Sequence, residues 1–120
     1  MLVAAAGPAS NFVMAVGAAM VLHLLPVSPV TLGEPNLSVP IASLLGQAMR
    51  LNVLLAVFNM VPIPPLDGGN VLAGLLPRAL AVPFAMVRPY GFLLLYLLMY
   101  TGVLTMLVVP PFRFITSWLP

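Results

Sequence analysis

Charged residues are almost absent from this chain, and their scarcity limits its fold more than any other feature does. Only 5% of its 120 residues are charged, whereas 62% are hydrophobic. A soluble domain carries roughly 25% charged residues, so this chain could not cover an aqueous surface. In a bilayer, helices satisfy their own backbone hydrogen bonds. We therefore expect an all-α integral membrane protein, with a single membrane domain over residues 1–120.

Apolar stretches and prolines alternate along the chain. A helix needs about 20 residues to cross the roughly 30 Å hydrocarbon layer. Long apolar stretches cover residues 9–25, 41–61 and 90–109, and a short one covers residues 66–76. We therefore expect about three transmembrane helices plus a proline-broken half-helix.

Two segments between these stretches are predicted to be connectors. Residues 26–40 hold four prolines and Glu34, the only glutamate, which favours an extended loop outside the hydrocarbon. Residues 79–89 form the second connector. Arg78 and Arg88 lie at this connector, whereas residues 26–40 contain no arginine. The positive-inside rule therefore predicts that residues 78–89 face the cytoplasm. We expect a multi-pass protein of the cell (inner) membrane.

Small residues line one face of the first apolar stretch. Asn11, Ala15, Ala18 and Ala19 recur at helical spacing. Such residues let a second helix approach closely, so this face is predicted to be a helix contact. Pro8 suits the first turn of this helix, where a missing N–H costs nothing, and the residues before it are read as its N-terminal end.

Polar groups interrupt the second stretch. Ser43, Gln47 and Arg50 share one helical face, and Asn52 and Asn59 lie nearly opposite. Arg50 at mid-span would cost about 3 kcal/mol, so either it faces protein or water, or the first part of the stretch lies at the interface. Asn52 and Asn59 are either interhelical hydrogen-bonding groups or functional groups of a site.

Asp67 is the only acid within the apolar sequence. Three prolines precede it: Pro62, Pro64 and Pro65. Prolines cannot continue a regular helix, so irregular backbone is expected there. A carboxylate at membrane depth indicates a functional site, and Gly68 and Gly69 leave room beside it. Asp67 either caps the helix that starts at Gly68 or ligates a metal such as zinc, and the two roles can coexist.

Two motifs carry a family resemblance. Residues 7–11 read GPASN, and residues 52–69 read NVLLAVFNMVPIPPLDGG. In this order and separation they resemble the GPxxN and LDG segments of the site-2 proteases, a family of intramembrane zinc metalloproteases. The resemblance covers essentially the whole chain, which looks like the C-terminal part of the catalytic core. It implies hydrolysis of peptide bonds within or near transmembrane segments, as in regulated intramembrane proteolysis, with membrane lipid and a transmembrane protein substrate as partners.

The resemblance also implies roles for individual residues. Asp67 matches the aspartate that is the third zinc ligand of the family, and Asn59 matches a residue that holds or polarises the substrate peptide. The remaining motif positions are Gly7, Pro8, Asn11, Asn52, Pro62, Pro64, Pro65, Gly68 and Gly69.

The histidine half of the family's site has no counterpart here. In the family, an HExxH helix that precedes these motifs supplies two histidine ligands and a glutamate base. This chain contains no HExxH, and neither Glu34 nor His23 matches it. His23 is expected to reach the membrane interface from the far end of the first helix. Zinc would therefore require histidines from a missing segment or another chain, and the isolated chain is not expected to be active.

Other functions remain alternatives or are excluded. The arginines are too scattered for a phosphate-binding surface, so no nucleic-acid partner is expected. The chain has no cysteine, which excludes disulfides and thiolate metal sites. A non-catalytic membrane scaffold or regulatory fragment is one alternative, and a transporter or channel subunit, in which broken helices and buried acids form ion sites, is another.

Overall fold

The computed structural model describes residues 2–25, 37–64 and 66–119, and its regular elements are all helical. They are α1 (Leu2–Leu24), α2 (Ser38–Asn59), α3 (Asp67–Leu75), α4 (Arg78–Val87), the 3₁₀ turn η1 (Arg88–Tyr90), α5 (Gly91–Thr101) and α6 (Val103–Trp118). Three stretches are long and apolar enough to cross a membrane, namely Leu2–Leu24, Ser38–Asn59 and Arg78–Thr101, and α6 is a shorter apolar helix. The predicted all-α fold with about three spans is confirmed.

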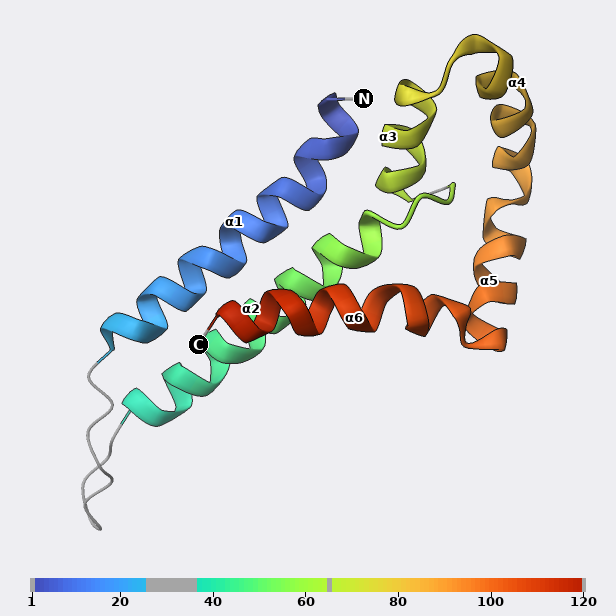
Figure 1. The fold of residues 1–120 in the computed structure, drawn as a ribbon. Helices are drawn as coiled ribbons and strands as arrows, with labels where there is room; N and C mark the ends of the chain where they lie inside the picture. The colour runs from blue at the N-terminus through green and yellow to red at the C-terminus, as the bar shows by residue number, and fades with distance from the viewer. Residues whose placement is uncertain (1, 26–36, 65, 120) are drawn as a thin grey trace.

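Helices α1 and α2 lie side by side and run in opposite directions (Figure 1). Their interface is built from small residues on α1 and larger ones on α2. Ala15 and Ala19 of α1 are buried against Met49 and Val53 of α2, and Ala18 packs at the edge of this cluster. Short side chains allow the two backbones to approach closely. The predicted contact face of the first helix is therefore confirmed.

Helix α1 starts at Leu2, so the residues before Pro8 belong to it, as predicted. Pro8 itself lies inside the helix and is buried instead of occupying its first turn. Helix α2 starts at Ser38, inside the predicted loop over residues 26–40, and the part of that loop at residues 26–36 lies outside the described residues. Pro40 is tolerated in α2 because the first N–H groups of a helix have no partner within it.

The C-terminal half differs from the prediction in two ways. The expected connector at residues 79–89 is mostly helical, since α4 continues through η1 into α5. The expected span at residues 90–109 is broken at Gly102, whose φ of 78° is left-handed. Glycine adopts this conformation without a Cβ penalty, which ends α5 there. The chain then turns, and α6 returns across α2 (Figure 1).

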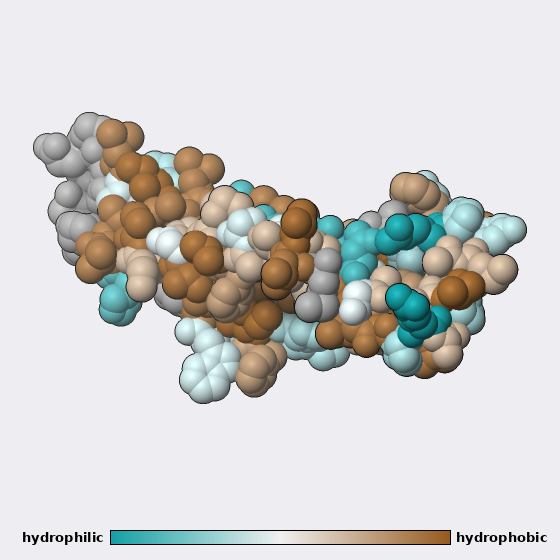
Figure 2. Space-filling model, turned by 90° about the horizontal axis from the view of Figure 1, so that it is seen from above, coloured by the Kyte–Doolittle hydropathy of each residue, from teal (hydrophilic) through white to brown (hydrophobic). Residues whose placement is uncertain are grey.

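The surface of this elongated molecule, 66 × 30 × 21 Å, is mainly apolar. Large hydrophobic side chains such as Val3 and Tyr100 are 88% and 92% exposed. In Figure 2 hydrophobic residues cover most of the visible face, and the strongly hydrophilic ones gather toward the end where α3 and α4 lie. An exposed apolar surface of this extent suits lipid and not water.

Candidate functional site

The backbone between α2 and α3 is irregular, as the prolines predicted. Its N–H groups are satisfied by short local turns: the N–H of Ile63 donates to the Val61 carbonyl at 2.8 Å, and that of Leu66 donates to the Ile63 carbonyl at 2.9 Å. Val61, Pro64 and Leu66 are buried, whereas Pro62 is exposed. The segment is therefore buried only in part, whereas irregular backbone at membrane depth is expected to be buried against other helices.

Two glycines let the start of α3 fold back onto this irregular segment. A Cβ added to Gly68 would lie 2.2 Å from the carbonyl oxygen of Met60, and one added to Gly69 would lie 2.7 Å from the backbone nitrogen of Pro64. No real side chain tolerates such distances to backbone atoms. The Gly-Gly pair therefore fixes where α3 begins relative to the end of α2.

Asp67 is the first residue of α3. The predicted cap geometry is wrong, because the helix begins at Asp67 itself, Leu66 is the N-cap and no side-chain capping hydrogen bond forms. The carboxylate is half-buried, and it lies in the first helical turn, where the unpaired backbone N–H groups favour a negative charge. Since it is not used as a cap, its oxygen atoms keep their lone pairs for another partner.

Helix α1 approaches the carboxylate from the other side. A Cβ added to Gly7 would lie 2.8 Å from Oδ2 of Asp67. The motif at residues 7–11 therefore contacts the motif at residues 52–69 directly. The absence of a side chain at Gly7 permits this contact. Sequence reasoning identified Gly7 only as a motif residue, because nothing in a single sequence shows which later residue a glycine faces.

The asparagines of the two motifs have different surroundings. Asn59 is the last residue of α2 and half-buried, and it precedes Met60, whose carbonyl faces Gly68. It therefore lies beside the fold-back that also carries Asp67. Asn52 donates from Nδ2 to the Ala48 carbonyl at 2.9 Å, within its own helix. Among the described residues, Asn52 makes no interhelical hydrogen bond, which was one of its two predicted roles. Asn11 lies one helical turn beyond Gly7 on α1.

The residues that the structure describes contain no group of three or more His, Cys, Asp or Glu side chains able to hold a metal ion. His23 lies on α1, which at 1.5 Å per residue places it about 24 Å beyond Gly7 along the axis. It is exposed, and it lines a hollow with Trp118 and Leu119. A catalytic zinc site usually has three protein ligands, more than the described residues bring together.

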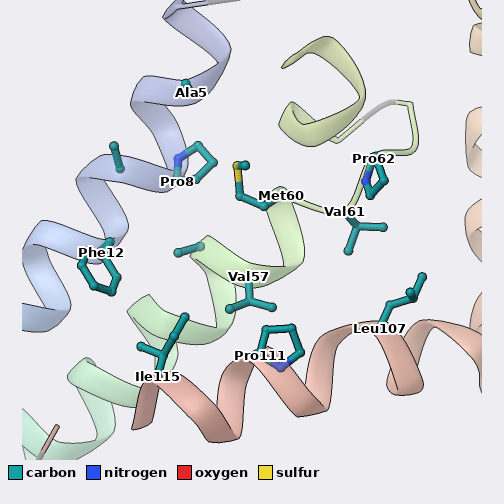
Figure 3. Close-up of a pocket in the computed structure, with 12 residues that line it drawn as sticks. Ala5, Pro8, Phe12, Val57, Met60, Val61, Pro62, Leu107, Pro111 and Ile115 are labelled. Atoms are coloured by element: carbon teal, nitrogen blue, oxygen red, sulfur yellow. The ribbon is translucent and has the colours of Figure 1, made fainter. Parts of the chain in front are cut away.

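An apolar cavity of about 570 Å³ adjoins the site. It lies between α1, the end of α2 and α6, and its walls carry Pro8, which follows Gly7, and Met60, which faces Gly68 (Figure 3). Leu107, Pro111 and Ile115 of α6 form the opposite wall. The sequence did not reveal this cavity, because it exists only where α6 returns to α2 after Gly102.

Two curated proteins are similar to this chain. One, from Bacillus subtilis, is named "Putative zinc metalloprotease YwhC" and is 29% identical over 100 residues, 83% of this chain and 45% of that protein. The other, from Synechocystis sp., is named "Putative zinc metalloprotease sll0528" and is 40% identical over 70 residues, 58% of this chain and 16% of that protein. The chain spans less than half the length of either relative. No protein-family model and no solved structure matches significantly. The resemblance to site-2-type zinc metalloproteases is thus confirmed as distant homology.

Proposed function

We propose that this distant homologue of zinc metalloproteases provides the aspartate ligand of a membrane-embedded protease of the site-2 type, which hydrolyses peptide bonds within or near transmembrane segments. The observation that carries the proposal is the setting of Asp67. Its carboxylate is not a helix cap, it lies at an irregular backbone segment, and Gly7 leaves room for it on α1. An acid held in this way in an apolar chain is typical of a functional site.

The chemistry of the donor set defines what else the site requires. Asp67 offers a carboxylate oxygen, which is a suitable zinc ligand, but the other ligands would be imidazoles from an HExxH-containing segment or chain. When bound, zinc lowers the pKa of a coordinated water toward 7 and polarises the substrate carbonyl. Asp67 would hold one coordination position at a fixed place against α1, and the Asn59 amide would donate a hydrogen bond to the substrate peptide.

The irregular segment also limits how a substrate is held. A substrate helix must unwind before its peptide bond can be attacked, and its freed N–H and carbonyl groups then need partners. The N–H groups of Val61, Ile63 and Leu66 are already hydrogen-bonded locally, and prolines have none. We therefore infer that this segment offers to a substrate the carbonyl oxygens that accept none of these local bonds, such as that of Pro62. Donors such as the Asn59 amide would come from side chains.

The alternative of a non-catalytic scaffold has Asp67 as a helix cap and Asn52, Asn59 and Arg50 as bundle contacts. The first of these features is not found, because α3 has no side-chain capping hydrogen bond. The Asp67 carboxylate is half-buried, and no capping hydrogen bond explains its position.

Zinc content tests the proposed function. The chain would be purified in detergent alone and, separately, joined to an HExxH-bearing transmembrane helix; the joined form is here termed the extended protein. We expect the isolated chain to lose zinc on dialysis, because one carboxylate leaves the ion largely solvated. The extended protein should retain one zinc and cleave a transmembrane reporter peptide. Stoichiometric zinc in the isolated chain, or none in the extended protein, would contradict the proposal.

We further propose that the protein spans the cell membrane several times with Arg78 and Arg88 on the cytoplasmic side. The chain contains no cysteine, so single cysteines report accessibility without background. Leu37 lies just before α2 and Ala79 lies at the start of α4, and both are exposed. Leu37→Cys and Ala79→Cys should react with a membrane-impermeant maleimide from opposite sides of sealed vesicles, whereas reaction from one side would refute this topology.

A further inference from the structure

Helix α3 carries Asp67 but is too short to hold its own direction. It has nine residues, and isolated helices shorter than about 12–15 residues are marginal. The contacts at Gly68 and Gly69 anchor its first turn. Its last residues, Gly74 and Leu75, are exposed. Helix α1 also meets this first turn at Gly7, and an anchor beyond the first turn would further fix the helix axis and the direction of the carboxylate.

The structure contains such an anchor one turn beyond Asp67. Nη2 of Arg88 donates a short hydrogen bond to Oδ1 of Asn70, across 18 residues of sequence. Asn70 follows Asp67 by three positions, so the two side chains leave neighbouring turns of α3 on the same side. Hydrogen bonds from a guanidinium are stronger than neutral ones. In the part of the chain that the structure describes, this bond links α3 to η1.

The position of Arg88 supports this interpretation. It lies at the junction of α4 and α5, in an apolar stretch that the proposed topology brings to the cytoplasmic membrane surface at Arg88. An arginine in such a stretch is costly unless it finds a partner or reaches the interface. The amide oxygen of Asn70 is such a partner. The positive-inside rule explains why an arginine lies on the cytoplasmic side, but it does not explain why Arg88 is hydrogen-bonded to Asn70 of α3.

We propose that Arg88 is a positioning residue, which acts through Asn70 to fix the direction of α3 and therefore of the Asp67 carboxylate. What Asp67 does once positioned rests on the proposed function, whereas the link itself concerns only the orientation of α3. This link joins the C-terminal helices to the site.

A distance measurement tests the link directly. Spin labels at Val3→Cys on α1 and Leu75→Cys on α3 would occupy sites that are 88% and 66% exposed. With Arg88 present, we expect one narrow distance distribution by pulsed electron paramagnetic resonance. Arg88→Met should remove the single narrow peak, and Asn70→Ala should do the same. The double variant should be no broader than either single one, because both remove one bond.

A second label pair separates positioning from general loss of structure. Val13→Cys on α1 and Leu44→Cys on α2 are 68% and 65% exposed, and their distribution should not change in Arg88→Met. An unchanged Val3–Leu75 distribution would overturn the proposal, and so would equal broadening of both pairs.

Zinc affinity then tests what the link does for the site. In the extended protein, Arg88→Met should weaken zinc binding about tenfold, the lower end of the range for residues that orient a ligand, and Arg88→Lys should recover part of the loss. Unchanged zinc affinity would overturn the role of Arg88 toward Asp67. If the extended wild-type protein binds no zinc but the Val3–Leu75 result holds, the proposed function fails and the link stands.

Discussion

The region around Asp67 and the region from α4 to α6 are held together in opposite ways. Around Asp67, added Cβ atoms at Gly7, Gly68 and Gly69 would meet other atoms at less than 3.0 Å. In the C-terminal region α4 has no buried residue, and a Cβ at Gly102 would meet nothing within 4 Å. Close backbone contact fixes the site, whereas α4 and α5 expose most of their apolar side chains, as suits lipid, and only α6 of this region packs Leu104 and Val108 against Val61 and Leu66 in the described structure. A Gly→Ala substitution, which adds one methyl group, should therefore affect stability and zinc affinity very differently in the two regions.

The largest effect is expected at Gly68. In Gly68→Ala the new methyl would overlap backbone atoms of Met60 and Val61, at 2.2 Å and 2.5 Å from their carbonyl oxygens. Backbone cannot move aside as a flexible side chain can, so we expect a loss of about 3 kcal/mol in the free energy of unfolding, the upper range for overpacking. Denaturant unfolding in detergent micelles measures it.

Gly46→Ala is the matched control for Gly68→Ala. Nothing lies within 4 Å of a Cβ at Gly46, and alanine is the better helix former by about 1 kcal/mol. This variant should be as stable as the wild-type protein or slightly more so. Equal stability of Gly68→Ala and Gly46→Ala would show that the fold-back at α3 is not closely packed.

A smaller and more selective effect is expected at Gly7. The methyl of Gly7→Ala would lie 2.8 Å from Oδ2 of Asp67, so the carboxylate must turn away. We expect zinc affinity in the extended protein to fall about tenfold, as for changes that misorient a ligand, with little loss of stability. Gly17→Ala on the same helix, where a Cβ meets nothing within 4 Å, should bind zinc normally. Equal zinc affinities would mean that α1 does not constrain Asp67.

The smallest effect is expected in the C-terminal region. Gly102 has a left-handed φ of 78°, which costs other residues about 1–2 kcal/mol. Gly102→Ala should lower the free energy of unfolding by about 1 kcal/mol and leave zinc affinity in the extended protein unchanged. A loss of zinc in this variant would show that the turn between α5 and α6 is coupled to the site.

The local features of the site were predictable from the sequence. Prolines at 62, 64 and 65 forbid a regular helix whatever the surroundings are, and the predicted break and short helix are found there. The small-residue face of α1 was also predictable, since Ala15 and Ala19 recur at helical spacing and are buried. In these cases neighbouring residues alone determine the outcome.

Features that depend on distant residues were not predictable. The contact of Gly7 with Asp67 joins residues of two helices, and the bond from Arg88 to Asn70 joins residues 18 positions apart. Residues 79–89 were predicted to be a connector because they contain Pro83, Arg88 and Pro89, but most of them belong to α4. The turn at Gly102 was missed because a glycine in an apolar run is compatible with a continuous helix.

The central claim is that Asp67 is a metal ligand, and zinc content together with proteolysis in the extended protein tests it most directly. Asp67→Ala should lose zinc and cleavage of the transmembrane reporter together, because a three-ligand site becomes a two-ligand site. Asp67→Asn should keep the fold, seen as an unchanged unfolding transition, but bind zinc poorly because its amide oxygen carries no charge. If the Asp67→Ala protein retains normal zinc content and turnover, Asp67 is not a ligand and the account is wrong.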